Sequence, residues 1–378
     1  MIKDQPKITV LIPTFNRAKF LGECIESILA QTLPASQILV VNDGSSEDTL
    51  KVLARFGSSV ETIETVNLGK SGALNQGLTK VRGDYLWIFD DDDVVLPDAL
   101  ERFTRPLEND PDYGFSYSSY YFTDTIPETG RIGPILFEQD IPDLESRGFL
   151  IPLLENNFLG GAALFARTSC YKAVGNFDES LVRSQDYEMA IRIARRFKGA
   201  RAPGGATFHY RQHEGARGST KDRFEAELRL KKWLFYDQTF FRKLYQELEL
   251  QEYLPPGSGA DQGSRQAFFQ RLMIMANKQL ILESIRDLEV LAGFADQSAL
   301  SKAEQAIIRD MIHSKCYQAG SLLDQNEFSR AIMKLSASSG VIRSLRSELS
   351  KAILKNVWGN FGPRRAVKKI LRIVRLYI

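Results

Sequence analysis

Four consecutive aspartates, Asp90–Asp93, are the residues of this sequence with the clearest capacity for chemistry. They follow the apolar run Tyr85–Phe89, which is typical of a buried strand. Adjacent carboxylates at the end of such a strand repel one another, and a hard divalent cation that prefers oxygen ligands would offset this repulsion. Because successive side chains of a strand alternate, Asp90 and Asp92 are expected on one face and the other two on the opposite face. An exposed acidic turn or helix N-terminus is the alternative.

A single carboxylate, Asp186, forms a second candidate site. It lies at the beginning of Gln185–Phe197, whose apolar spacing predicts a helix. A carboxylate that faces a cleft can accept the proton of an attacking hydroxyl group. A carboxylate before a helix can also act as its N-cap, by accepting hydrogen bonds from the first amide groups. The residues by themselves leave both roles open.

Two histidines, His209 and His213, lie in the segment Phe208–His213. A spacing of four residues would place them on one face of a helix, but this segment has the character of a strand that leads into a loop. A metal site shared by the two is therefore not expected. His213 alone is a candidate metal ligand or diphosphate contact, with an exposed loop histidine as the alternative, and His209 is expected to be structural.

Alternating strands and helices over the first hundred residues must position these side chains. Strands are predicted at Ile8–Ile12, Ile38–Val41, Val60–Val66 and Tyr85–Phe89, and helices at Arg17–Gln31, Ser45–Arg55 and Lys70–Arg82. Strands separated by single helices pair in parallel through right-handed crossovers. Ligands of such sheets bind beyond the carboxyl ends of the strands, so Thr14–Asn16, Asn42–Ser45 and Asp90–Asp93 are expected along one edge.

The remainder of the chain is predicted to change from mixed to helical structure. Further strands are predicted at Phe115–Phe122, Leu164–Arg167 and Thr207–Arg211, and only helices after Lys221. Residues 1–220 are therefore expected to form an α/β domain, and residues 221–378 an all-α extension. The run Pro255–Gly259 is the best candidate linker, because proline and glycine interrupt regular structure.

The chain of 378 residues has a net charge of +2, which argues against a nucleic-acid partner. The three cysteines are far apart and show no metal or disulfide spacing, so buried free thiols in a reducing cytosol are expected. The N-terminus lacks the apolar core of a signal peptide, and no apolar run is long enough to cross a membrane. These features predict a cytoplasmic protein.

The C-terminal segment 363–378 is predicted to be a basic amphipathic helix. Six basic and no acidic residues occur in 357–378, so the other 356 residues carry +2 − 6 = −4. A helix of this length cannot span a bilayer, but its apolar stripe and positive charges suit the surface of an anionic membrane. Packing against the protein's own helices, or against a second copy in a homodimer, is the alternative.

Several motifs occur in the order and spacing of a known enzyme family. They are Val10–Arg17 (VLIPTFNR), Val40–Ser45 (VVNDGS), Asn67–Gly77 (NLGKSGALNQG), Gly83–Asp93 (GDYLWIFDDDD), Gly175–Glu179 (GNFDE) and Ser184–Ala194 (SQDYEMAIRIA). Together, over about Ile8 to His213, they resemble the family 2 glycosyltransferases, and the aspartate run resembles their DxD motif. The resemblance implies the GT-A fold, in which a mostly parallel central sheet is flanked by helices. The implied reaction moves a sugar from a nucleotide-diphosphate donor with inversion at the anomeric carbon.

The resemblance also implies roles for individual residues. Asp186 corresponds to the catalytic base, and Asp92 and His213 to the ligands of a divalent metal. The implied nucleotide and donor contacts are Pro13, Thr14, Asn16, Asp43, Asn67, Gly69, Lys70, Asn75, Asp90, Asp91 and Asp93. Asp43 matches the nucleobase contact, which is compatible with a UDP- or dTDP-linked donor. The chain departs from the family at Gln185, where an acidic residue is common, and the missing charge would lower the pKa of Asp186.

The leading hypothesis is a Mn²⁺- or Mg²⁺-dependent, inverting glycosyltransferase. Its acceptor would be a glycan or a lipid-linked sugar in surface-polysaccharide or glycolipid synthesis, which is compatible with peripheral contact of 363–378 with the cytoplasmic membrane. A sugar-1-phosphate nucleotidyltransferase is one alternative, but its Gly-rich N-terminal loop is replaced here by Pro13–Arg17. A non-catalytic membrane-associated scaffold is another, and the retained carboxylates argue against it.

Overall fold

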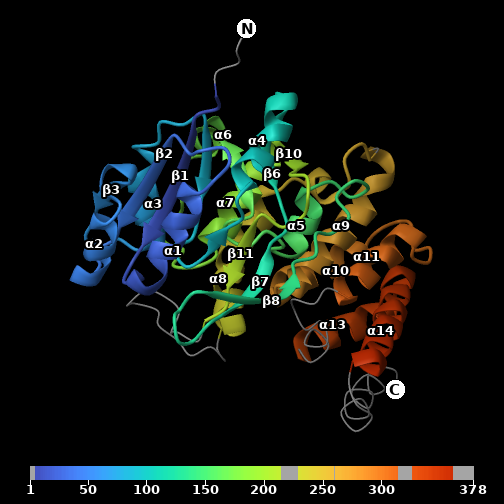
Figure 1. Cartoon of the computed structure of the whole chain (residues 1–378). Helices are drawn as coiled ribbons and strands as arrows, with labels where there is room; N and C mark the ends of the chain where they lie inside the picture. Colours follow the sequence, from blue (N-terminus) through green and yellow to red (C-terminus); the bar gives the residue numbers. More distant parts are fainter. Residues whose placement is uncertain (1–4, 214–228, 259, 314–325, 361–378) are drawn as a thin grey trace. The chain divides into compact units, whose positions relative to one another are not determined.

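The computed structural model divides the chain into two compact units. It describes residues 5–213, 229–258, 260–313 and 326–360. The first unit consists of residues 1–142 and 157–236, and the second of residues 143–156 and 237–378 (Figure 1). The boundary predicted at residue 220 and the C-terminal segment 363–378 lie outside the described residues. None of the described helices is both long and apolar enough to cross a membrane.

A seven-stranded mixed sheet forms the centre of the first unit. Its strands, in sheet order, are β10 (Lys198–Arg201), β6 (Tyr113–Tyr117), β9 (Leu164–Arg167), β4 (Tyr85–Ile88), β1 (Ile8–Thr14), β2 (Gln37–Asn42) and β3 (Glu61–Glu64). Strand β1 pairs in parallel with β2 and β4, β2 with β3, and β6 with β10, whereas β9 is antiparallel to both of its neighbours. The predicted mostly parallel sheet is therefore confirmed.

Helices pack against this sheet and against each other (Figure 1). They are α1 (Ala18–Leu29), α2 (Glu47–Ala54), α3 (Lys70–Leu78), α4 (Ala99–Asn109), α6 (Thr168–Val174) and α7 (Gln185–Arg196), with a 3₁₀ turn at Gly57–Ser59. Gly77 allows α3 to approach β1 and β2 closely, because a Cβ atom at this position would lie 2.5 Å from Cδ1 of Leu11. This close approach brings the N-terminus of α3 to the edge of the sheet where β1 and β2 end.

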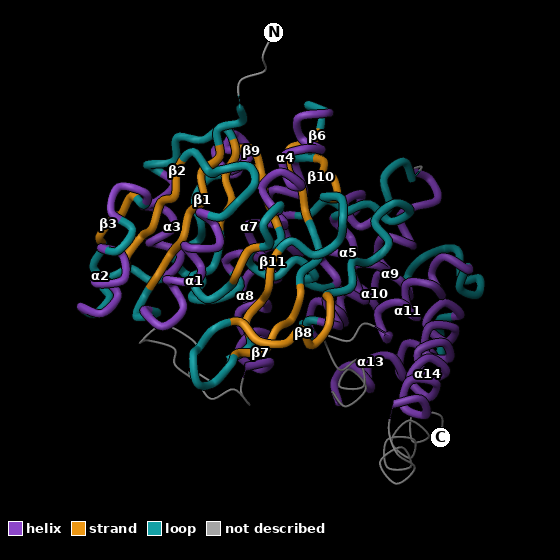
Figure 2. The backbone as a smooth tube through the Cα atoms, viewed as in Figure 1, coloured by secondary structure: helices purple, strands orange, loops and turns teal. Residues whose placement is uncertain are grey.

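A smaller sheet of four strands was not predicted. Its order is β5 (Val94–Val95), β11 (Phe208–Arg211), β7 (Tyr121–Thr125) and β8 (Ile132–Glu138). The last three strands are labelled in Figure 2. The prediction of one strand over Phe115–Phe122 was wrong, because the chain leaves the first sheet after Tyr117 and enters the second at Tyr121. Buried Ser118 satisfies its polar groups at the break, where its amide donates to the carbonyl oxygen of Ala163 and its hydroxyl bonds that of Thr207.

The second unit is helical in the residues that the structure describes. Its elements are α5 (Leu150–Glu155), the 3₁₀ turn η3 (Leu250–Tyr253), α9 (Ala260–Asn277), α10 (Ile281–Ala292), α11 (Lys302–His313), α13 (Asn326–Ser336) and α14 (Gly340–Asn360). Helix α8 (Arg229–Glu247) begins in the first unit and ends in the second. The predicted linker was wrong, because Pro255–Ser258 joins η3 to α9 inside the second unit.

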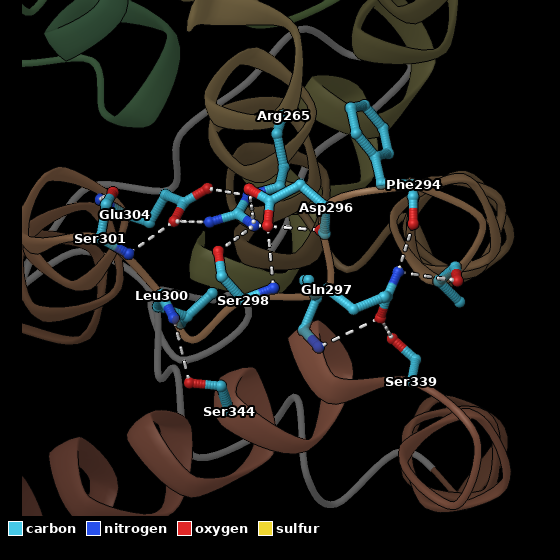
Figure 3. A network of polar contacts seen from close by, with 12 residues as sticks. Arg265, Phe294, Asp296, Gln297, Ser298, Leu300, Ser301, Glu304, Ser339 and Ser344 are labelled. Atoms are coloured by element: carbon cyan, nitrogen blue, oxygen red, sulfur yellow. Dashed lines mark hydrogen bonds and ion pairs between the residues drawn. The ribbon is translucent and has the colours of Figure 1, made fainter.

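A polar network fixes the connection between α10 and α11 (Figure 3). The guanidinium group of Arg265 on α9 donates to both carboxylate oxygens of Glu304, at 2.7 and 2.8 Å, and to Asp296 at 2.9 Å. Gln297 accepts a hydrogen bond of 2.7 Å from the hydroxyl group of Ser339, just before α14. Side chains from distant segments therefore replace the regular hydrogen bonds that this loop lacks.

Candidate active site

Two loops that follow β1 and β2 are tied together at the edge of the large sheet. The amide of Asp43 donates to the carbonyl oxygen of Thr14 at 2.9 Å. Asn16 has a φ of 55°, and its side-chain oxygen accepts a hydrogen bond of 2.8 Å from the amide of Ser46. The amide of Asn16 in turn donates to the hydroxyl group of Ser45 at 3.0 Å. The expected juxtaposition of Thr14–Asn16 with Asn42–Ser45 is therefore present.

The buried carboxylate of Asp43 orders the loop that leads into α3. One oxygen accepts hydrogen bonds from the hydroxyl of Thr65 at 2.6 Å and from the amide of Leu68 at 2.7 Å. The other accepts from the amide of Gly69 at 2.8 Å. Asn67 and Gly69 both have positive φ, so this loop needs such support to hold its turn. The structure thus joins two of the predicted nucleotide contacts, Asp43 and Gly69, by a hydrogen bond, in the loop that also contains Asn67.

The aspartate run forms a turn instead of continuing the strand. Strand β4 ends at Ile88, and the amide of Asp93 donates to the carbonyl oxygen of Asp90 at 3.3 Å. One carboxylate oxygen from each of Asp90, Asp92 and Asp93 lies within 4.8 Å of the others. The strand-based expectation that Asp93 faces away from Asp90 and Asp92 was therefore wrong, because the turn brings it back to them.

Burial changes the protonation of two of these aspartates. It raises the pKa of Asp91 to about 7, with a further contribution from the negative charge of Asp92 and an opposing one from Arg17. It also raises the pKa of Asp93, whose side chain is almost completely buried. One oxygen of Asp93 accepts a hydrogen bond of 2.9 Å from the amide of Arg211. Burial thus favours the neutral form of these two carboxyl groups, whereas Asp90 and Asp92 are partly exposed.

Lys70, Asp90 and Asp186 meet beside a glycine. The ammonium group of Lys70 lies 2.5 Å from Oδ1 of Asp90. A Cβ atom on Gly161 would lie 3.0 Å from Oδ2 of Asp90 and 3.2 Å from Oδ2 of Asp186, so both carboxylates lie against bare backbone. The three side chains line one cavity whose other side is apolar and includes Leu74. The structure therefore brings the predicted base together with the aspartate run.

Electrostatics within this group oppose one another. Burial raises the pKa of Asp186, the charge of Lys70 lowers it, and Asp90 raises it, so that the net pKa lies above the ordinary value of an aspartate. For Lys70, burial favours a lower pKa, but Asp90 and Asp186 outweigh it and the net pKa is raised.

The sequence left open whether Asp186 is the N-cap of the helix that follows it. Ser184 is the residue before α7, and Asp186 lies in the first turn of the helix.

The imidazole of His213 lies next to Asp92. Its Nε2 atom is 3.1 Å from Oδ2 of Asp92 and 3.2 Å from Nη1 of Arg17. Behind it, the ring of Phe20 lies 5.0 Å from the imidazole and also contacts the guanidinium group of Arg211. His209 is on the strand, where its Nδ1 atom lies 3.0 Å from the hydroxyl of Thr123. His209 thus contacts β7, and burial lowers its pKa.

These residues fit a hard divalent cation. Such an ion binds six ligands at about 2.1 Å, which places adjacent ligand atoms about 3 Å apart. The Nε2 atom of His213 and Oδ2 of Asp92 are 3.1 Å apart, and oxygens of Asp90 and Asp93 lie nearby. Oδ2 of Asp93 is buried and has no hydrogen-bond partner. A donor set of carboxylate oxygens and one imidazole suits Mn²⁺ or Mg²⁺.

Three charged residues of the site were not singled out from the sequence: Arg17, Glu23 and Arg211. Arg211 is fully buried, and its side chain donates to the carbonyl oxygen of Asp92 at 2.5 Å and to Glu23 at 2.6 Å. The ion pair with Glu23 joins residues 188 positions apart. Only the fold brings these charges together, so no local pattern indicated them.

Asn75 contacts the segment 175–179. Its side-chain oxygen accepts a hydrogen bond of 2.8 Å from the amide of Phe177, and its amide group donates to Phe177 and Glu179. In this conformation Asn75 holds the segment 175–179 against α3, which positions α7 and hence Asp186.

Pro13 and Thr14, two further predicted nucleotide contacts, are buried at the end of β1.

Comparison with known proteins finds relatives in sequence and in fold. Residues 9–172 match the family model for glycosyl transferase family 2. An uncharacterized glycosyltransferase of Rickettsia felis is 30% identical over 193 residues, which are 50% of this chain and 32% of that protein. The chain spans between 31% and 59% of the length of this protein and of three other rickettsial relatives.

Two solved structures are similar over most of the chain. One is S. aureus TarS 1–349 in complex with UDP-GlcNAc, with a TM-score of 0.52 and 15% identity over 91% of this chain and 90% of that chain. The other is mannosyltransferase PcManGT from Pyrobaculum calidifontis in complex with GDP-Man and Mn²⁺, with a TM-score of 0.51 and 17% identity over 95% and 89%. Residues 9–172 are thus similar to glycosyl transferase family 2, and the chain has the GT-A fold.

Proposed function

We propose that this chain is a metal-dependent, inverting glycosyltransferase that moves a sugar from a nucleotide-diphosphate donor to an acceptor hydroxyl. The observation that carries the proposal is the position of Asp186 beside Asp90 against the bare backbone of Gly161. A candidate base and a candidate diphosphate site thus lie next to each other. Such a pair suits a direct displacement, in which base and leaving group act on opposite sides of one carbon atom.

Asp186 would act on the acceptor. As the acceptor oxygen forms its bond to the anomeric carbon, Asp186 takes the hydroxyl proton. The bond from that carbon to the diphosphate oxygen breaks on the opposite face, and its electron pair leaves with the diphosphate. A raised pKa makes Asp186 a better proton acceptor than an exposed aspartate, provided that it is ionised. No covalent enzyme intermediate is needed, and the configuration at the anomeric carbon inverts.

The other residues would hold the donor. Asp92 and His213 would bind the divalent cation, with Asp90 and Asp93 beside them, and a bound cation supplies positive charge that stabilises the leaving diphosphate. Lys70 adds a fixed positive charge between Asp90 and Asp186. The loops that contain Thr14, Asn16, Asp43 and Gly69 would receive the nucleoside. A UDP- or dTDP-linked donor and a glycan or lipid-linked acceptor remain our proposals.

A donor screen tests this proposal. Full-length protein is incubated with UDP-, dTDP- and GDP-linked sugars and Mn²⁺ or Mg²⁺, and nucleoside diphosphate release and thermal shift are measured. We expect one donor to give turnover that a chelator abolishes. In Asp186→Asn, turnover should fall at least about a hundredfold while donor binding stays within about twofold of wild type. Equal turnover of this variant would refute the assignment of the base, and turnover in chelator would refute the metal requirement.

A further inference from the structure

Arg17 lies directly beside the atoms that we expect to bind the metal. It precedes α1, and its Nη1 atom is 3.2 Å from Nε2 of His213 and 3.7 Å from Oδ2 of Asp92. Those two atoms are themselves 3.1 Å apart. The guanidinium group of Arg17 therefore places a positive charge beside the two atoms that we expect to bind the divalent cation.

Arg17 and a bound cation compete for the same atom. The Nε2 atom of His213 either donates a hydrogen to Asp92 or presents a lone pair, and in the second form Arg17 and a metal compete for that lone pair. A divalent cation on Asp92 and His213 would also face the positive charge of Arg17 at short range and with limited screening. Binding of the cation thus requires the guanidinium group to move away.

The site has a second arginine that cannot move in this way. Arg211 is fully buried and is held by Glu23, by Gly130 and by the backbone of Asp92. The side chain of Arg17 is 25% exposed and comes from the loop between β1 and α1. Arg17 is therefore the arginine of this pair that can exchange partners.

We propose that Arg17 is a positioning residue that couples cation binding to diphosphate binding, an inference that rests on the proposed function. Without ligand, Arg17 balances the charge of Asp92 and lies against Nε2 of His213. When a cation binds these two residues, the released guanidinium group pairs with the diphosphate, whose oxygens match its paired donors. Each ligand then favours the other, and this coupling is the same whichever binds first.

The experiment measures Mn²⁺ binding to the full-length protein by electron paramagnetic resonance of free Mn²⁺, alone and with saturating UDP or GDP. We expect Arg17→Ala to bind Mn²⁺ alone about fivefold more tightly than wild type, because a competing charge is gone. The factor by which the nucleoside diphosphate strengthens Mn²⁺ binding should fall about fivefold or more. Arg17→Lys should lie between the two proteins. Arg55→Ala, which removes an exposed arginine that pairs with Glu26, should match wild type.

Three results would overturn the inference. They are unchanged or weaker binding of Mn²⁺ alone to Arg17→Ala, an unchanged coupling factor, and no Mn²⁺ binding by either protein. The first two leave the proposed function intact, because wild-type turnover and its loss in chelator are measured separately. The third also removes the metal requirement, and transfer in the presence of chelator would then show whether glycosyl transfer itself stands.

Discussion

At the scale of single residues, Asp186 and Lys70 make a specific prediction about pH. The pKa of Asp186 is raised by burial and by Asp90 and lowered by Lys70. Because the base must be ionised to accept a proton, turnover should fall as the pH drops through this raised pKa. Lys70→Gln removes the influence that lowers the pKa, so the acidic limb of the pH profile should move to higher pH.

The profile of kcat against pH at saturating donor checks this prediction. Lys51→Gln is the matched control, because Lys51 is exposed on α2 and forms an ion pair with Asp48 within the same helix. Its acidic limb should coincide with that of wild type. A limb that moves to lower pH in Lys70→Gln would contradict the assigned electrostatics.

Gly161 carries a second prediction at this scale. A methyl group on this residue would press on Asp90 at 3.0 Å and on Asp186 at 3.2 Å. Gly161→Ala should therefore displace both carboxylates and lower kcat roughly tenfold or more, with little change in thermal stability. Gly22→Ala on α1 is the control, because its methyl group would meet only ordinary contacts at 3.6 Å or beyond. Wild-type kcat in Gly161→Ala would show that the two carboxylates need no close approach to this backbone.

Part of the candidate site could be predicted from the sequence because it follows strand ends. Buried parallel strands leave continuous apolar runs, so Asp43 and Asp90 could be located as the polar residues that follow them. The pairing of Arg211 with Glu23 could not be predicted, because it depends on two elements that meet only in the folded chain. Nor could the place where the chain turns to return Asp93 to Asp90, since four identical residues do not show which of them form the turn.

At the scale of elements, the network around Arg265 should stabilise the helices of the second unit. The carboxylate of Glu304 is buried, and Arg265 binds both of its oxygens (Figure 3). Arg265→Ala leaves this charge without its partner and should lower the free energy of local unfolding by about 3 kcal/mol. Hydrogen exchange of the amides in α9 and α11 measures the loss.

The control for this prediction is Arg242→Ala. Arg242 lies on α8, is 56% exposed, and reaches Glu283 only at 4.0 Å. Exposed pairs of this kind contribute about 0–1 kcal/mol, so exchange in α9 and α11 should not change measurably. Equal protection in Arg265→Ala and wild type would mean that apolar packing alone fixes these helices.

Strand β9 shows why sequence patterns predict elements better than they predict sheets. Leu164–Arg167 was predicted as a strand and has these bounds in the structure. Its antiparallel pairing with β4 and β6 is set by the path of the chain between them, which hydrophobic pattern does not encode. The prediction of a single strand over Phe115–Phe122 was wrong for a related reason. Aromatic residues, which are common in strands, continue through the point where the chain passes from one sheet to the other.

At the scale of the whole molecule, charge is unevenly distributed along the chain. Six basic residues lie in 357–378, and the other 356 residues sum to −4. We propose that the segment 363–378 contacts an anionic membrane surface, which would hold the enzyme near a lipid-linked acceptor. Deletion of 363–378 should reduce co-sedimentation with anionic liposomes, and added salt should weaken the binding of the full-length protein. Undiminished co-sedimentation of the deletion variant would contradict this role.

The path of the chain between its two units limits how the protein can be divided. Residues 143–156 leave the first unit to join the second, and the chain then returns at residue 157. In the second unit, Glu155 of α5 accepts hydrogen bonds from Gln270 and Asn277 of α9. A fragment that ends near residue 220 would keep α5 and lose α9, leaving buried Leu153 and Leu154 uncovered. The segments of the two units therefore alternate along the amino-acid sequence. A truncation or domain exchange that treats the units as consecutive modules would disrupt both of them.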